Sequence, residues 1–165
     1  MELWDDLMRP LKPDFDRLNP ASRLKSAATV IKWTLEHFSP PVREDETRDL
    51  ITGSLASFES ALQQGVNAVH RTSELDERIE LVLDGSAEPG TSNLVMACVQ
   101  THSHDSELKG KRLFNVFGSC YNAVLEQEFP GPLIDIEDEV ANPRCRETIA
   151  FQQDVLQQSL WHKGR

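Results

Sequence analysis

The sequence predicts an all-α fold: a single-domain antiparallel helical bundle of about six main helices. Three observations lead to this prediction. Helix-start signals recur along the chain, apolar residues return at spacings of three and four, and the strict alternation typical of β-strands is scarce. Because the connectors between the predicted helices are short, successive helices should run antiparallel. At 165 residues the chain fits one domain over residues 1–165.

The first main helix begins at Asn19-Pro20, which pairs an N-cap residue with proline in the first turn. Pro40-Pro41 ends it near Ser39. Its apolar stripe consists of Leu24, Ala28, Ile31, Leu35 and Phe38. Before it, residues 1–19 are either an N-terminal extension or carry a short helix over residues 2–8.

Acidic residues open the second main helix at Glu44, where they complement the positive end of the helix dipole. Its stripe is Ile51, Leu55, Phe58 and Leu62. Gly65 either ends this helix or is passed at a modest cost. The third main helix begins at Ser73, a predicted N-cap, and a loop rich in Gly and Pro follows from Asp84 to Gly90.

A fourth helix begins with Thr91 or Ser92 as its cap and ends near His104. The fifth follows Gly110 and is expected to be central, because its apolar residues cover a wide face. These are Leu113, Phe114, Phe117, Cys120, Tyr121, Val124 and Leu125. After it, residues 135–139 are predicted to form an acidic loop, and Asn142-Pro143 begins the sixth helix.

Negative charge is concentrated in one stretch of the chain. Residues 43–88 hold eleven acidic residues and four arginines, a net charge of −7 out of −10 for the whole chain. This charge argues against nucleic-acid and membrane binding and favours a basic protein partner; the alternative is an acidic surface that serves solubility alone. The predicted partner-binding residues are the acids of the second and third main helices: Glu44, Asp45, Glu46, Asp49, Glu74, Asp76, Glu77 and Glu80.

Targeting signals are not apparent in the sequence. No run approaches the length of apolar residues that a membrane span needs, and the first residues are acidic rather than a signal peptide. The three cysteines, Cys98, Cys120 and Cys145, form no CxxC motif. A cytoplasmic protein with reduced, mostly buried thiols is therefore expected. Among them, Cys145 is the thiol expected to react most readily with a probe. It lies in the first turn of a predicted helix between Arg144 and Arg146, an arrangement that lowers the pKa of a thiol.

The best enzymatic lead is His70 together with His104 and Asp105. Phosphohydrolases of the HD superfamily are all-helical and use a His, a later His-Asp pair and a distant Asp, here Asp135 or Asp154. Such residues hold a divalent ion that lowers the pKa of bound water. The simpler interpretation places His102 and His104 at a polar helix end, where histidines often cap carbonyl groups.

Other candidate chemistry is weaker. Walker A, GxSxG and GxGxxG motifs are absent, and Asp135 to Glu139 lacks EF-hand spacing, so the acidic loop is interpreted as solvated surface. We predict no catalytic residues, no metal and no cofactor.

The three tryptophans, Trp4, Trp33 and Trp161, lie partly outside the apolar stripes. They are either exposed residues that bind a partner or part of a buried face that is wider than the stripes.

The outline of residues 23–126 resembles small, acidic, all-helical bacterial immunity proteins of polymorphic toxin systems. The features that carry this resemblance are a capped first helix with Ala27-Ala28 and Trp33, an acidic second helix from Glu44, and Ala97-Cys98 ahead of His102. The resemblance implies a non-enzymatic protein that neutralises a cognate toxin, and it transfers no residue roles. A helical scaffold that only self-associates is a third possibility.

Overall fold

The computed structural model describes residues 1–85, 88–103, 106–132 and 134–162 and is all-helical over these ranges, apart from one isolated β-bridge. Six helices have eleven residues or more, as predicted: α3 (Pro20–Glu36), α4 (Asp45–Gln63), α5 (Ser73–Gly85), α6 (Thr91–Thr101), α7 (Gly110–Glu128) and α9 (Pro143–Trp161). The shorter elements are α1 (Glu2–Met8), the 3₁₀ turn η1 (Arg9–Leu11), α2 (Lys12–Arg17) and α8 (Ile136–Ala141).

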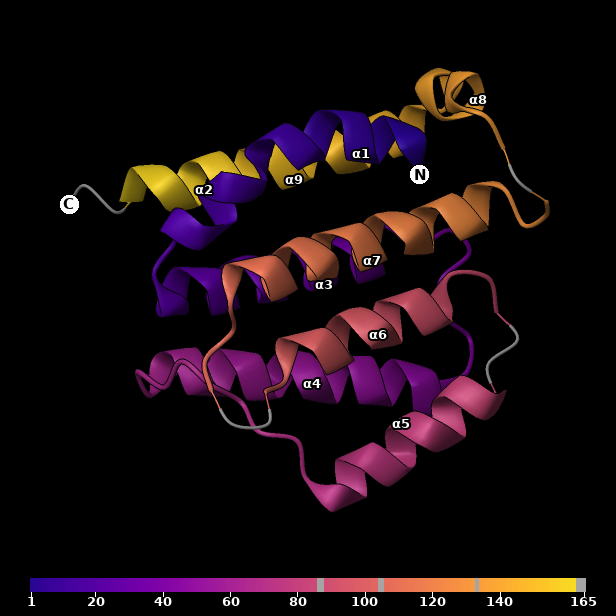
Figure 1. Ribbon diagram of the computed structural model, residues 1–165. Helices are drawn as coiled ribbons and strands as arrows, with labels where there is room; N and C mark the ends of the chain where they lie inside the picture. The colour runs from indigo at the N-terminus through magenta and orange to yellow at the C-terminus, as the bar shows by residue number, and fades with distance from the viewer. Residues whose placement is uncertain (86–87, 104–105, 133, 163–165) are drawn as a thin grey trace.

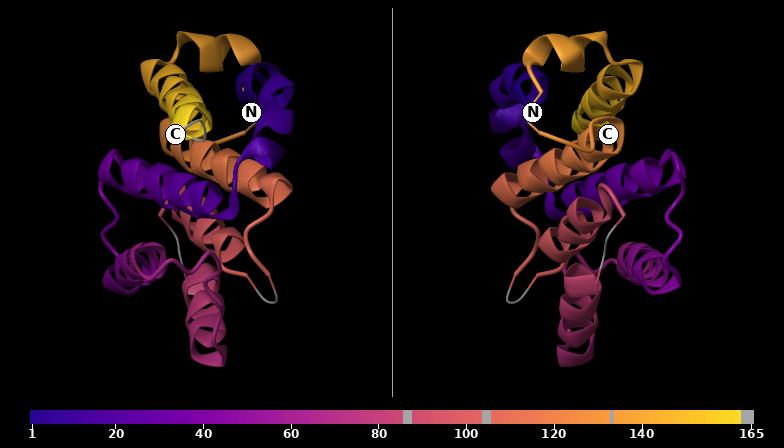
Figure 2. Two further views of the ribbon diagram at one scale, coloured as in Figure 1. Left: turned by 90° about the vertical axis from the view of Figure 1, so that its left-hand side faces the viewer. Right: turned by 90° about the vertical axis from the view of Figure 1, so that its right-hand side faces the viewer.

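The helices stack in successive layers (Figure 1). Helices α1, α2, α8 and α9 form the upper layer, α3 and α7 lie beneath it, and α6 and α4 come next. Helix α5 lies at the lower edge and projects from the rest of the molecule (Figure 2). Successive long helices alternate in direction, as expected from the short connectors. No helix among the described residues is long and apolar enough to cross a bilayer.

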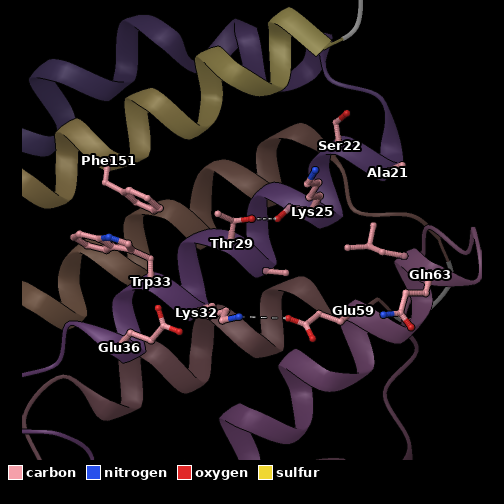
Figure 3. A pocket seen from close by; sticks show the side chains of 12 residues that line it. Ala21, Ser22, Lys25, Thr29, Lys32, Trp33, Glu36, Glu59, Gln63 and Phe151 are labelled. Atoms are coloured by element: carbon pink, nitrogen blue, oxygen red, sulfur yellow. Dashed lines mark hydrogen bonds and ion pairs between the residues drawn. The ribbon is translucent and has the colours of Figure 1, made fainter. Parts of the chain in front are cut away.

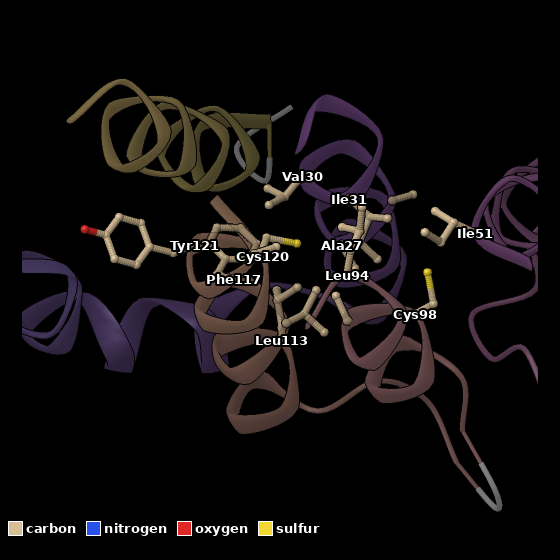
Figure 4. Close-up of a cluster of buried hydrophobic side chains, with 14 of the residues drawn as sticks. Ala27, Val30, Ile31, Ile51, Leu94, Cys98, Leu113, Phe117, Cys120 and Tyr121 are labelled. Atoms are coloured by element: carbon tan, nitrogen blue, oxygen red, sulfur yellow. The ribbon is translucent and has the colours of Figure 1, made fainter. Parts of the chain in front are cut away.

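Helix α7 is central, as its wide apolar face predicts: it packs against α2, α3, α6 and α9. Its buried side chains belong to one hydrophobic core with those of α3, α4 and α6, among them Ile31, Ile51 and Leu94 (Figure 4). Tyr121 and Phe117 of α7 are fully buried there. Burial of this kind supplies most of the free energy that favours folding.

Of the four side-chain N-caps predicted from the sequence, two are confirmed. Asn19 and Asn142 accept hydrogen bonds from the backbone amides of Ser22 (2.8 Å) and Cys145 (3.0 Å), so both Asn-Pro predictions are confirmed. The predicted cap Ser73 is wrong, because Thr72 Oγ1 accepts from the Leu75 amide at 3.2 Å instead. Helix α6 is preceded by Gly90 rather than capped by a hydroxyl.

The N-terminal residues belong to the core and are not an extension. Trp4, Met8, Phe15 and Leu18 are buried, and Trp4 Nε1 donates to Gln152 Oε1 at 2.7 Å. The Trp4 ring lies 4.9 Å, centroid to centroid, from Phe114. Helices α1 and α2 therefore close the side of α7 that would otherwise face water.

The prediction of an acidic loop over residues 135–139 is wrong. Asp135 caps a short helix, α8, by accepting from the Asp138 amide at 3.1 Å. Glu139 of this helix is fully buried rather than solvated. A helix of six residues carries too little apolar periodicity to be recognised from sequence, which is why the acidic composition was misleading.

Candidate partner-binding surface

Helix α5 carries half of the predicted acidic residues and has one buried face. Thr72 caps its start, and Glu74 and Asp76 lie in its first turn, where the helix dipole favours carboxylates. Ile79 and Val82 are its buried residues, and the helix packs on α4 and α6. The opposite face is open to solvent along its length.

The structure brings the start of α4 against the end of α5. A hollow of about 340 Å³ lies there, lined by Glu44, Asp45, Glu46, Leu81 and Val82 among others. Glu44 Oε2 accepts from Thr47 Oγ1 at 3.1 Å, which holds its carboxylate at the helix start. Three acidic residues and two apolar residues thus line the same hollow.

The acidic residues at the other end of α5 do not join this hollow. Helices α4 and α5 run in opposite directions, so Glu74 and Glu77 lie at the end of α5 that is remote from the start of α4. At 1.5 Å per residue, Glu74 is roughly 10 Å along the helix from Leu81. The eight predicted residues therefore form two groups on one side of the molecule rather than one cluster.

Two of the eight acids have arginine partners. Asp45 forms an ion pair with Arg48 of the same helix, and Asp76 pairs with Arg71 at 3.1 Å. The carboxylates of Glu46, Asp49, Glu74, Glu77 and Glu80 are exposed. Most of the negative charge of this side is therefore open to a partner.

Leu81 is the residue that sequence reasoning missed. It is 69% exposed and lines the hollow together with Glu44, Asp45 and Glu46. The exposure of Leu81 could have been predicted from the sequence. At 3.6 residues per turn, the apolar stripe through Leu75, Ile79 and Val82 leaves Leu81 on the other side of the helix. Single exposed apolar residues are common on protein surfaces. Leu81 is a candidate contact residue because acidic residues line the same hollow.

His70 lies in the connection between α4 and α5, and His102 directly follows α6. A parallel β-bridge joins His70 to Ser103, and the Ser103 amide donates to the Val69 carbonyl at 2.9 Å. His102 lies at the end of α6, as predicted, but its surroundings are not polar. It is 3% exposed, packs on Phe58, and its Nε2 lies 3.3 Å from Ser54 Oγ. Burial lowers the pKa of His102 to about 4, against a smaller opposing influence of the Val69 carbonyl.

Among the described residues, no two of the predicted HD-type ligands come together. The β-bridge places the segment of His70 beside the end of α6, but His104 and Asp105 lie outside the described residues. Asp135 caps α8, which lies at the opposite end of the molecule from the α4–α5 connection, and Asp154 is on α9 in the upper layer (Figure 1). Within the described ranges, no group of three metal-ligating side chains comes together.

The cysteines are all buried. For Cys98 and Cys120 this agrees with the prediction of core thiols. For Cys145 the prediction of a reactive thiol is wrong, because its side chain is fully covered and burial raises the pKa of the thiol. Arg144 does lower that pKa, as expected, but burial outweighs its influence, and Arg144 also pairs with Glu128.

Comparisons with protein-family models, with curated proteins and with solved structures return no match. The function proposed below therefore depends on the chemistry of the chain's own residues.

Proposed function

We propose that this chain is a non-enzymatic binding protein whose α4–α5 side engages a basic protein partner, as an immunity protein engages its toxin. The observation that carries the proposal is the exposed Leu81 beside the carboxylates of Glu44, Asp45 and Glu46. An arginine or lysine has the complementary shape and charge. Its aliphatic stem would lie on Leu81 and Val82, while its cationic head would meet the carboxylates.

The rest of the surface supports the same kind of partner. The two acidic groups at the ends of α5 extend the negative field over one side of the molecule, which accelerates the approach of a basic protein. The exposed residues of α5, and those of α4 that do not line the groove on α3, supply a large part of the roughly 20 residues that one side of a standard interface needs. A basic nuclease toxin, as the resemblance to immunity proteins implies, fits this description.

The test begins with capture of the tagged protein's partner from lysate of the source organism at low and high salt. With the captured partner, association is then measured for a variant carrying Glu44→Lys, Asp45→Lys and Asp49→Lys. We expect its association rate at low salt to fall at least tenfold and its salt dependence to flatten. The matched control carries Glu137→Lys, Glu147→Lys and Asp154→Lys, the same charge change on exposed residues of α8 and α9.

Leu81→Ser tests the apolar contact separately from the charge. It should increase the dissociation rate by roughly five- to thirtyfold if Leu81 is a buried contact, since such residues contribute about 1–2 kcal/mol. Val140→Ser is the control, because Val140 is also an exposed apolar residue but lies on α8. An association rate that is unchanged by the triple charge reversal would contradict the assignment of this surface.

One observation favours a second candidate, an HD-like metal-dependent phosphohydrolase. The bridge between His70 and Ser103 places His70 beside the segment that leads to His104 and Asp105. This candidate expects stoichiometric divalent metal in the purified protein, lost in His70→Ala. Metal at background level, with no phosphatase activity after reconstitution, would eliminate it.

A further inference from the structure

A groove lies on the far side of α3 from the core, between α4 and α9. The volume of the groove is about 740 Å³, which is within the range of volumes of small-molecule binding sites. Ala28 and Leu62 form part of its floor, and Trp33 and Phe151 lie at one end (Figure 3). Sites for small molecules have this character: apolar walls and a few polar groups that fix the orientation of the ligand.

The aromatic end of the groove excludes a flat ligand. Trp33 is stacked between two rings, with centroids 4.0 Å from His37 and 4.4 Å from Phe151 and interplanar angles of 21° and 10°. Both faces of the indole are therefore covered, and only its edge is open to the groove. Stacking needs a free ring face, whereas an aliphatic chain packs against a ring edge.

Two lysines, Lys25 and Lys32, and two glutamates, Glu36 and Glu59, line the groove, so its formal charge is zero on a protein of net charge −10. Among the described residues, the Lys25 ammonium group has no ion-pair partner. Lys32 pairs with Glu59 at 4.0 Å, and both side chains of this pair are about half exposed. Such a long, solvated pair contributes little, so Lys32 is available to exchange Glu59 for a ligand.

We propose that the groove binds an aliphatic carboxylic acid. The carboxylate lies at Lys25, and the chain runs over Ala28 and Leu62 toward the edge of Trp33 and Phe151. Along α3 the distance from Lys25 to Trp33 is roughly 12 Å at 1.5 Å per residue. This site is separate from the acidic α4–α5 surface, so its test is independent of the proposed function.

Sodium decanoate is the probe, titrated by calorimetry and by the tryptophan indole N–H signals in NMR spectra. We expect saturable 1:1 binding with a Kd on the order of 10⁻⁴ M, a value typical of ligands of this size. The indole signal of Trp33 should move. Those of Trp4, which is buried against α9, and of Trp161, which is exposed at the end of α9, should not.

Variants locate the ligand in the groove. Lys25→Gln should weaken binding about three- to fivefold and Lys25→Glu about tenfold, because the first removes an exposed charge pair and the second adds repulsion. Thr29→Phe should weaken it at least tenfold by filling the groove, where Thr29 is exposed. Lys111→Glu, the same change at an exposed lysine of α7, is the control and should leave the Kd unchanged. Circular dichroism establishes that each variant is folded.

Comparison ligands distinguish the proposal from its rivals. Decanol, which lacks the charge, should bind at least fivefold more weakly, and 2-naphthoate, a flat anion, should also bind more weakly. Equal affinity for decanol would show a general apolar docking surface, and tighter binding of naphthoate would show a ring site; either result overturns the proposal. It is equally overturned if decanoate does not bind, or binds unchanged to Lys25→Glu and Thr29→Phe.

Discussion

At the scale of single residues, the structure gives some polar groups roles that their sequence neighbourhood conceals. Glu139 lies in a run of acids, yet its carboxylate is buried and accepts hydrogen bonds from the Met1 amino group (2.7 Å), the Glu2 amide (2.8 Å) and the Tyr121 hydroxyl (2.5 Å). Burial by itself would raise the pKa of Glu139, but the hydrogen bonds outweigh it and hold that pKa below its ordinary value. Its role is to connect α8 to α1 and α7.

Glu139→Gln should lower the free energy of unfolding by about 2–3 kcal/mol at neutral pH, because the buried donors lose their charged acceptor. Glu137→Gln, at an exposed position of the same helix, should change it by less than about 0.5 kcal/mol. Urea denaturation of the two variants measures the difference. Equal, small effects would show that the Glu139 contacts do not contribute to stability.

His102 should make stability fall in mild acid. The pKa of the folded state is about 4 because of burial, whereas an unfolded histidine titrates near 6.5. Between these values the unfolded chain binds more protons, so the free energy of unfolding decreases as the pH is lowered through this window. From pH 8 to pH 5 the contribution of His102 is about 2 kcal/mol.

Denaturation curves at several pH values check this expectation. His102→Gln should remove that part of the pH dependence, and His162→Gln, at an exposed position beyond the last turn of α9, should retain it. If the slopes of wild type and His102→Gln coincide between pH 8 and 5, His102 does not titrate as its burial implies.

At the scale of elements, the long helices form where their apolar stripes predict, and their junctions depend on particular backbone geometries. Gly90, just before α6, has a φ of +83° and approaches α7 closely. A Cβ atom at this position would lie 2.2 Å from the Ala123 carbonyl oxygen. Both the conformation and the space therefore require glycine at this junction.

Gly90→Ala should destabilise the protein by at least about 2 kcal/mol, from the sum of left-handed strain and the contact with Ala123. Gly53→Ala is the matched control, since Gly53 lies inside α4 with nothing within 4 Å of its added Cβ. It should instead stabilise by about 0.5–1 kcal/mol, because alanine favours the helix. Thermal unfolding distinguishes the opposite signs, and a neutral Gly90→Ala would show that the α6–α7 junction adapts.

At the scale of the whole molecule, one core joins elements from both ends of the chain. The N-terminal helices cover α7 through Trp4 and Phe15, and α9 contacts both α3 and α7. The acidic hollow and the groove lie outside this core, the first between α4 and α5 and the second between α4 and α9. The two proposed binding sites therefore have no lining residue in common.

Removal of residues 1–18 should abolish cooperative folding. It deletes four buried side chains, Trp4, Met8, Phe15 and Leu18, each of which contributes about 2–5 kcal/mol, against a total stability of about 5–15 kcal/mol. Circular dichroism and NMR dispersion of the truncated chain measure the outcome. Leu7→Ser, at a half-exposed position of α1, should keep the native spectrum. A truncated chain that unfolds cooperatively would show that these residues are dispensable.

The sequence by itself determined the helical class, the six long helices and the central place of α7. These features depend on periodicity and on caps such as Asn19 and Asn142, which act within a few residues. It also located the acidic stretch. Only the tertiary structure decided that Glu139 is buried, since its partner Met1 lies 138 positions away. It also decided that Glu44, Asp45 and Glu46 line a hollow with Leu81, apart from Glu74 and Glu77, and that α4 and α9 leave a groove on α3. Such properties depend on how distant segments pack, and no local pattern encodes that packing.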